Sequence, residues 1–391
     1  MRASVIGLVV LAAVADAAPR MPAPEPAALD DACTDKACTK KALDGFRAAL
    51  AAQRAGKAKR PLRVSYFGDS LTADDHITHA LREKLGALVG RGGPGFVFAA
   101  PPHPFCQHRA VTRVVGGEWQ IHGVSSSPPL DRLIGLGGSA EGSGTIRLAS
   151  TAPVSRVDVH YLEQPRGGKL AVVADGSLVQ ELSTLGDRKK AAFVRVDVPQ
   201  TTKKIELRAS GRVRLFGASL EAERGAVVDN LGVVNATAKA LNKHNMPAHW
   251  KNQLAHRESD LVIVMLGTNE ASWLGAGGAG MAEHERVFGQ LLASIRSGNP
   301  TGSCLVISPL DQMDFTGAKP QPRASIPAMV AAQHRAATAN GCAFWDVYEW
   351  MGGKGASLRW KKHGLVIKDF QHPTSTGAAR IADALYRGLV R

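Results

Sequence analysis

Val64-Ser65-Tyr66-Phe67-Gly68-Asp69-Ser70-Leu71 is the stretch that decides the fold. Its β-branched and aromatic residues favour a strand, which stops at a Gly-Asp-Ser turn. Apolar residues then recur at helical spacing from Leu71 to Leu88, which predicts a helix. Ser70 is therefore expected between a strand's carboxyl end and a helix's amino end, where backbone N–H groups point outward. This position suits a nucleophile whose reaction generates an oxyanion. Simple capping of the helix by Asp69 or Ser70 is the competing interpretation.

Length and composition bound the class of protein. The 391 residues, 45% of them hydrophobic, are enough for two folded units. The start combines a basic residue, a short apolar core and a small-x-small cleavage site, so residues 1–18 are predicted to be a signal peptide. No apolar run is long enough to span a bilayer, so the mature protein is predicted to have no transmembrane segment. We expect an exported protein, periplasmic or extracellular.

Five cysteines fit an oxidising compartment. Cys33 and Cys38 enclose a small loop and are the best candidates for a pair. Cys304 and Cys342 each open a predicted strand, so they could bridge neighbouring strands, and Cys106 is left over. Connectivity does not follow from sequence alone, and the spacing shows no zinc-site pattern.

The formal net charge of +14 would attract polyanions. Because the basic residues are scattered, nucleic acid is not predicted as a partner. An acidic polysaccharide or cell-wall polymer is the favoured partner, and the alternative is that the charge only keeps a Gly- and Ala-rich protein soluble.

Changes in residue pattern divide the chain into four regions. Residues 19–60 are predicted to form a linker and one peripheral helix. In 61–100 and 223–391, continuous apolar strands alternate with helices, which is typical of a parallel sheet covered on both faces. Residues 101–222 contain short alternating runs with a hairpin signal at Asp175-Gly176, which predicts a β-sandwich or jelly roll that interrupts the α/β unit.

A serine nucleophile needs a base and a group that orients the base. His372 lies in the loop before the last predicted helix, and Asp369 is three residues earlier, so one turn can bring carboxylate and imidazole together. A purely structural Asp–His pair is the alternative. Gly232 and Asn269 follow predicted strand ends, where parallel sheets place their ligands. With the N–H of Ser70, they are candidates for an oxyanion hole, although a turn residue and a helix cap would also explain them.

The order Gly-Asp-Ser-Leu, Gly, Gly-x-Asn and Asp-x-x-His resembles the SGNH (GDSL) hydrolase superfamily over about 61–100 and 223–391. The resemblance implies a flavodoxin-like parallel sheet with Ser70 as nucleophile, His372 as base and Asp369 as its orienting partner. It also implies oxyanion donors from Ser70, Gly232 and Asn269.

The inserted β-region adds a second resemblance. Together with the Gly-Gly-Pro-Gly-Phe stretch at 92–96, it is similar to the bacterial peptidoglycan O-acetylesterases, which carry a carbohydrate-binding-module-like domain inside the hydrolase. This resemblance implies that residues 101–222 bind carbohydrate.

Two further side chains are candidate substrate contacts. His76 on the first helix is placed to line the cleft, with a surface position on the helix as the alternative. Trp273 follows Asn269 and is suited to stack on a sugar ring, with core packing as the alternative. The three tryptophans Trp345, Trp350 and Trp360 are compatible with either the core or a binding surface.

The sequence therefore predicts a serine esterase that removes O-acetyl groups from a cell-envelope polysaccharide such as peptidoglycan, through an acyl-enzyme and without metal or cofactor. The same site would serve a polysaccharide O-acetyltransferase, a lipase or a thioesterase. A non-catalytic carbohydrate-binding envelope protein with a vestigial hydrolase half is the alternative of a different class. Acetate release from an acetylated glycan discriminates between these functions.

Overall fold

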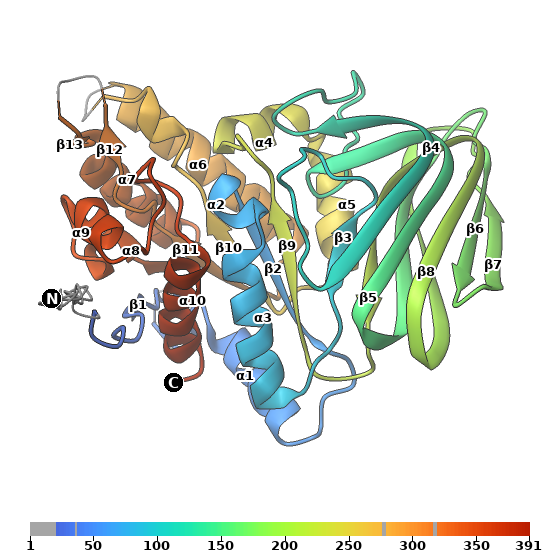
Figure 1. Cartoon of the computed structure of the whole chain (residues 1–391), viewed down its shortest axis with the longest axis horizontal. Helices are drawn as coiled ribbons and strands as arrows, with labels where there is room; N and C mark the ends of the chain where they lie inside the picture. Colours follow the sequence, from blue (N-terminus) through green and yellow to red (C-terminus); the bar gives the residue numbers. More distant parts are fainter. Residues whose placement is uncertain (1–20, 36, 276–278, 316–318) are drawn as a thin grey trace, which may run out of the picture.

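The structure is a computed structural model that describes residues 21–35, 37–275, 279–315 and 319–391. The predicted signal peptide at 1–18 lies outside these residues. Figure 1 shows an α/β part beside a β-domain made of long antiparallel strands. Among the described residues, no helix combines the length and the apolar character needed to cross a membrane.

The α/β part is built on a six-stranded sheet with the order β1-β14-β11-β10-β2-β9. Five of these strands pair in parallel, and β1 pairs antiparallel with β14 at one edge. The strands are β1 (Leu29–Asp30), β2 (Leu62–Gly68), β9 (Ala226–Gly232), β10 (Leu261–Met265), β11 (Ser303–Ile307) and β14 (Ala343–Trp345). Every residue of the five parallel strands is buried, as expected for a sheet covered on both faces. The predicted parallel α/β sheet is confirmed.

Helices cover both faces of this sheet because neighbouring strand residues point to opposite sides. Val64 and Tyr66 of β2 pack against one layer, and Phe67 packs against the other. The first layer contains α1 (Asp44–Arg54), α3 (His76–Val89), α8 (Val347–Trp350), α9 (Ala356–Lys362) and α10 (Ser375–Leu389), and the second contains α4 (Ala238–His244), α5 (Pro247–Arg257), α6 (Ala279–Gly298) and α7 (Ser325–Ala339). Trp345 and Trp360 are fully buried in the first layer, so they belong to the core.

The single helix expected after the Gly-Asp-Ser turn is broken in two. A short α2 (Ser70–Ala73) is followed by α3, and Asp75 between them has a left-handed φ of 60°. The buried carboxylate of Asp75 accepts hydrogen bonds from Thr78 and from the guanidinium of Arg82. The prediction was wrong here because Leu71 and Ile77 both pack into the same apolar cluster, so their spacing hides the break.

The β-domain is one continuous antiparallel sheet with the order β4-β5-β8-β6-β7, and β3 pairs with β8. Its strands are β3 (Gly95–Phe98), β4 (Val111–Gly123), β5 (Gly138–Glu163), β6 (Lys169–Ala174), β7 (Ser177–Ser183) and β8 (Lys190–Glu221). Residues 156–162 of β5 pair with two separate stretches of β8, which shows that these long strands bend around a shared core. The predicted hairpin at Asp175-Gly176 is confirmed, with both residues at positive φ as its turn requires.

The β-domain and the α/β part are joined by a shared hydrophobic cluster and by buried ion pairs. Ile134 of the β-domain packs in the same apolar cluster as Phe67 of β2. Glu221 at the end of β8 is buried and accepts hydrogen bonds from Arg63 of β2 (2.8 Å) and Arg257 of α5 (2.5 Å). Arg257 also binds Asp229 of β9 at 2.7 Å. These ion pairs tie the strand that returns from the β-domain to two strands of the central sheet, β2 and β9, and to the helix α5.

Both expected disulfides are present. Cys33 bonds Cys38, and Cys304 bonds Cys342 across the neighbouring strands β11 and β14. Cys106 is free and buried.

Candidate active site

Ser70 lies where β2 meets α2, as the sequence predicts. Asp69 precedes it and caps the short helix, because its Oδ1 accepts the Leu71 N–H at 3.0 Å. The capping interpretation is therefore correct for Asp69, while the Ser70 hydroxyl has another partner.

That partner is His372, whose Nε2 lies 2.8 Å from Ser70 Oγ. His372 Nδ1 lies 2.7 Å from Asp369 Oδ2, and the other carboxylate oxygen accepts the N–H groups of Gln371 and His372 at 3.0 Å each. Phe370, between the pair, has a φ of 57°, which helps close this tight loop before α10. The structure thus brings together the three side chains that the sequence assigns to nucleophile, base and orienting partner.

The surroundings of His372 and Asp369 shift the pKa values of both side chains. The hydrogen bond that His372 donates to Asp369, together with the negative charge of Asp369, raises the pKa of His372 above 6.5, against the opposing effect of partial burial. Partial burial by itself would raise the pKa of Asp369, but the hydrogen bonds from His372 and from the loop backbone lower it overall. Asp369 is consequently ionised when it faces the imidazole, which fixes Nδ1 as the protonated nitrogen and leaves Nε2 to accept a proton from Ser70.

The two other predicted oxyanion donors are Gly232, the last residue of β9, and Asn269, in the loop after β10. The Gly232 N–H donates to Asn230 Oδ1 at 3.0 Å, and Asn269 Nδ2 donates to the Ala236 carbonyl at 2.9 Å. A side chain at Gly232 would place Cβ 2.4 Å from the Ala73 N atom, so glycine allows α2 to pack directly on β9. Asn269 keeps a second amide N–H. The roles of Gly232 and Asn269 in an oxyanion hole stay predictions.

Asp69 and Glu270, two acids near the site, are buried, which the sequence did not predict. Burial raises the pKa of Asp69 to about 6. Burial also raises the pKa of Glu270 to about 7, and the negative charge of Asp69 contributes to this increase. Glu270 Oε1 accepts the Ala238 N–H and so holds the start of α4 beside the Asn269 loop. The adjacent Gly-x-Asn motif was the available sequence signal for Glu270, but nothing in the pattern indicates that this carboxyl is buried.

The two candidate substrate contacts have different surroundings. Trp273 follows the short η1 helix (Glu270–Ser272) and is 63% exposed, which excludes core packing. His76 is partly buried at the start of α3, with Nε2 2.7 Å from Nη2 of Arg109. Their contact with substrate stays a prediction.

Loops of the β-domain contact the elements that carry the site. The Gln107 N–H donates to the Ala73 carbonyl at 2.8 Å, and the Arg109 N–H donates to the Asp75 carboxylate at 2.6 Å. Ser125 Oγ donates to the Val234 carbonyl at 2.5 Å, just after Gly232. The β-domain is therefore anchored to α2 and to the loop after β9, beside Ser70.

A parallel α/β sheet that presents a Ser–His–Asp hydrogen-bond chain past its strand ends defines a serine hydrolase. Residues 204–380 match the model of the GDSL-like Lipase/Acylhydrolase family, and the matched region belongs to a parallel α/β sheet that carries an inserted β-domain. The match includes Asn269 and His372 but begins after Ser70, which joins the same sheet through β2.

One solved structure shares this fold over most of the chain. A peptidoglycan O-acetylesterase is similar with a TM-score of 0.72 at 22% identity, covering 87% of this chain and 93% of that chain. LAE5, an α/β hydrolase from the metagenome of Lake Arreo, Spain, has 22% identity over 42% of this chain and 74% of its own, with a TM-score of 0.31. Axe2, an acetylxylan esterase from Geobacillus stearothermophilus, has 17% identity over 42% and 73% of the two chains, also with a TM-score of 0.31. No curated protein matches the chain.

Proposed function

We propose that this hydrolase is an esterase that removes O-acetyl groups from a cell-envelope polysaccharide such as peptidoglycan. The observation that carries the proposal is the hydrogen-bond chain from Asp369 through His372 to Ser70. The β-domain anchored beside Ser70 supports a polymeric substrate, and the shared fold with a peptidoglycan O-acetylesterase supports the choice of polymer.

Acylation begins when Ser70 Oγ attacks the acetyl carbonyl carbon while His372 Nε2 takes the hydroxyl proton. The imidazolium is stabilised by the ionised Asp369 carboxylate on Nδ1. Collapse of the tetrahedral intermediate breaks the bond to the sugar oxygen, and His372 returns the proton to that oxygen. The products are a free sugar hydroxyl and acetyl-Ser70.

Deacylation repeats these steps with water as the nucleophile. His372 takes a proton from water as its oxygen attacks the acetyl carbon, and then returns a proton to Ser70 Oγ as acetate leaves. We assign the developing oxyanion to the Ser70 N–H and the second amide N–H of Asn269. In the free enzyme the Gly232 N–H donates to Asn230 Oδ1. Gly232 therefore contributes to the oxyanion hole only if this N–H is shared between Asn230 and the oxyanion.

We further propose that the protein acts outside the cytoplasm, in the cell envelope. Two disulfides, Cys33–Cys38 and Cys304–Cys342, support an oxidising compartment. In the cell envelope the enzyme would have direct access to the acetylated glycan.

Acetate release from O-acetylated peptidoglycan, measured beside acetylated xylan and acetylated alginate, tests the proposal. We expect the highest kcat/KM on peptidoglycan and loss of release in Ser70→Ala. Faster acetate release from xylan or alginate would reject peptidoglycan as the preferred substrate but would still support esterase activity. Transfer of acetyl to a glycan acceptor without free acetate would reject hydrolysis itself.

A further inference from the structure

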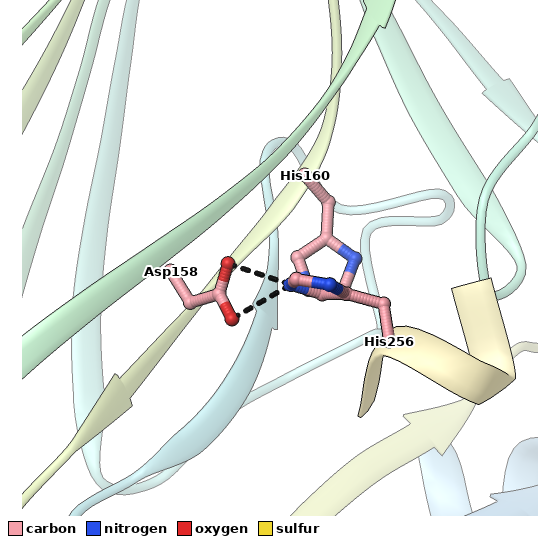
Figure 2. A group of neighbouring side chains, drawn as sticks. All are labelled: Asp158, His160 and His256. Carbon is pink, nitrogen blue, oxygen red and sulfur yellow. Dashed lines mark hydrogen bonds and ion pairs between the residues drawn. The ribbon is translucent and has the colours of Figure 1, made fainter. Parts of the chain in front are cut away.

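Asp158, His160 and His256 form a cluster where the β-domain meets the α/β part. Asp158 and His160 lie on β5, and His256 lies near the end of α5. Figure 2 shows the carboxylate and the two imidazoles converging from these elements. One ligand atom from each residue lies within 4.8 Å of the others. The cluster shares no residue with the Ser70 site.

His160 offers a buried nitrogen lone pair. The residue is fully buried, and its Nδ1 lies 2.7 Å from Gln253 Oε1, which can only accept a hydrogen bond. Nδ1 therefore carries the proton, and Nε2 is a buried acceptor without a hydrogen-bond partner among the described residues. The complete burial of His160 disfavours the charged imidazolium. A neutral imidazole whose other nitrogen donates to an oxygen is the arrangement of a metal-ligating histidine.

The other two groups complete a coherent donor set. His256 Nε2 lies 2.9 and 2.8 Å from the two carboxylate oxygens of Asp158. The His256 ring is stacked on Phe193 with a centroid distance of 3.7 Å, which fixes its orientation. Two imidazole nitrogens and one carboxylate suit a borderline divalent cation such as zinc better than magnesium, which prefers oxygen ligands.

We propose that Asp158, His160 and His256 form a binding site for a single zinc-type divalent cation that links β5 to α5. Bonds of about 2.0–2.2 Å in tetrahedral geometry require the ligand atoms to lie ~3.3 Å apart. The present separations of up to 4.8 Å are closed by small side-chain movements. Because His256 is partly exposed, the fourth position is accessible to water.

The positive charge of Arg195 opposes the binding of a cation at this cluster. Its Nε lies 2.9 Å from Asp158 Oδ2, so its positive charge weakens the attraction of the carboxylate for a cation. The Arg195 side chain is 40% exposed, which allows it to turn into solvent when a metal takes the carboxylate. Removal of this charge should therefore strengthen metal binding, whereas the same change would only weaken a simple ion-pair cluster.

The test is isothermal titration of the full, chelator-stripped protein with zinc chloride and, separately, magnesium chloride. We expect one zinc per chain and no measurable binding of magnesium. His256→Gln and Asp158→Asn should each reduce zinc affinity tenfold or more, and Arg195→Gln should increase it by about tenfold. His334→Gln is the matched control, because His334 forms a surface pair with Asp30 at 2.6 Å outside this cluster.

Cobalt(II) provides an independent spectroscopic readout. Binding should give the intense visible absorption of a tetrahedral nitrogen and oxygen site, and this band should be absent in His256→Gln. Acetate release by the variants reports that each remains folded. No zinc binding by the wild type would overturn the proposal. So would unchanged affinity in both His256→Gln and Asp158→Asn, or weaker binding in Arg195→Gln.

Discussion

His372 Nε2 lies 2.8 Å from Ser70 Oγ, although the two residues are 302 positions apart in the sequence. The contact joins the start of α2 to the loop before α10, on two elements that pack on the same face of the central sheet. It is the relationship on which the catalytic predictions rest.

Ser70→Ala should reduce ester hydrolysis by about 10⁴–10⁶-fold, because the nucleophile is lost while the fold is kept. Initial rates on nitrophenyl acetate measure the loss. Ser375→Ala is the matched control, since Ser375 is an exposed serine in the first turn of α10. Near-normal activity of Ser70→Ala would refute the mechanism, and a serine-directed phosphonylating reagent should label Ser70 alone.

The activity of the wild type should rise with pH as His372 loses its proton. Because Asp369 raises the pKa of His372, the midpoint of kcat/KM should lie above the ordinary value of about 6.5. Asp369→Asn removes the charge that stabilises the imidazolium, so the midpoint should move to lower pH and the plateau should fall. His372→Ala should approach the loss of Ser70→Ala. An unshifted profile in Asp369→Asn would argue against the orienting role of Asp369.

Trp273→Ala should lower kcat/KM on acetylated polysaccharide about 3- to 10-fold and leave nitrophenyl acetate hydrolysis unchanged. The reason is that an exposed indole beside Asn269 can stack on a sugar ring that the small ester lacks. Leu178→Ala, an exposed apolar side chain on β7, is the control. This is a sharper test than removal of 101–222, because that range supplies Ile134 to the shared core. Equal losses on both substrates would contradict the binding role.

Asp229→Asn should destabilise the fold by about 3–5 kcal/mol, because it leaves the buried Arg257 guanidinium without its full charge balance. Urea unfolding measures the change. Asp197→Asn breaks an exposed pair with Arg156 and should cost only about 0–1 kcal/mol. A similar cost for both variants would show that the buried network is not a special source of stability.

The same network predicts the response of stability to acid. Burial acts to raise the pKa values of Glu221 and Asp229, but the guanidinium of Arg257 lowers both below their ordinary values. A lowered folded-state pKa contributes stability that is present above the unfolded values of about 3.9 and 4.3 and is lost as pH falls through the folded values. Stability should therefore decline below about pH 4. Asp229→Asn should flatten that decline, and an unchanged slope would contradict this assignment.

Removal of Cys304–Cys342 should destabilise the protein more than removal of Cys33–Cys38. The first bridge spans 38 residues and the second spans 5, which corresponds to about 4 and 2 kcal/mol on a chain-entropy estimate. Thermal unfolding of the two Cys→Ser double variants measures the order. The reverse order would show that local packing outweighs loop closure.

Local patterns in the sequence were sufficient to predict the sheet, most helices and the loop that pairs Asp369 with His372. Apolar runs in β2 and β10 are long enough to be recognised as buried strands, and the last helix, predicted after His372, is α10. Asp369 and His372 are three residues apart, so a single turn determines their contact. The helix α5 was missed because its buried face carries polar side chains such as Gln253 and Arg257, and no apolar periodicity marks it.

By itself, the sequence determined the buried apolar strands and the turns that carry Ser70 and His372, because these features depend on side chains a few positions apart. Tertiary structure alone decided how buried polar groups are paired, because their partners come from distant parts of the chain. Arg257 meets Asp229 and Glu221, and folding brings Asp158 and His256 together although they are 98 positions apart. A buried charge or imidazole must find a partner, but the residue type does not say which one.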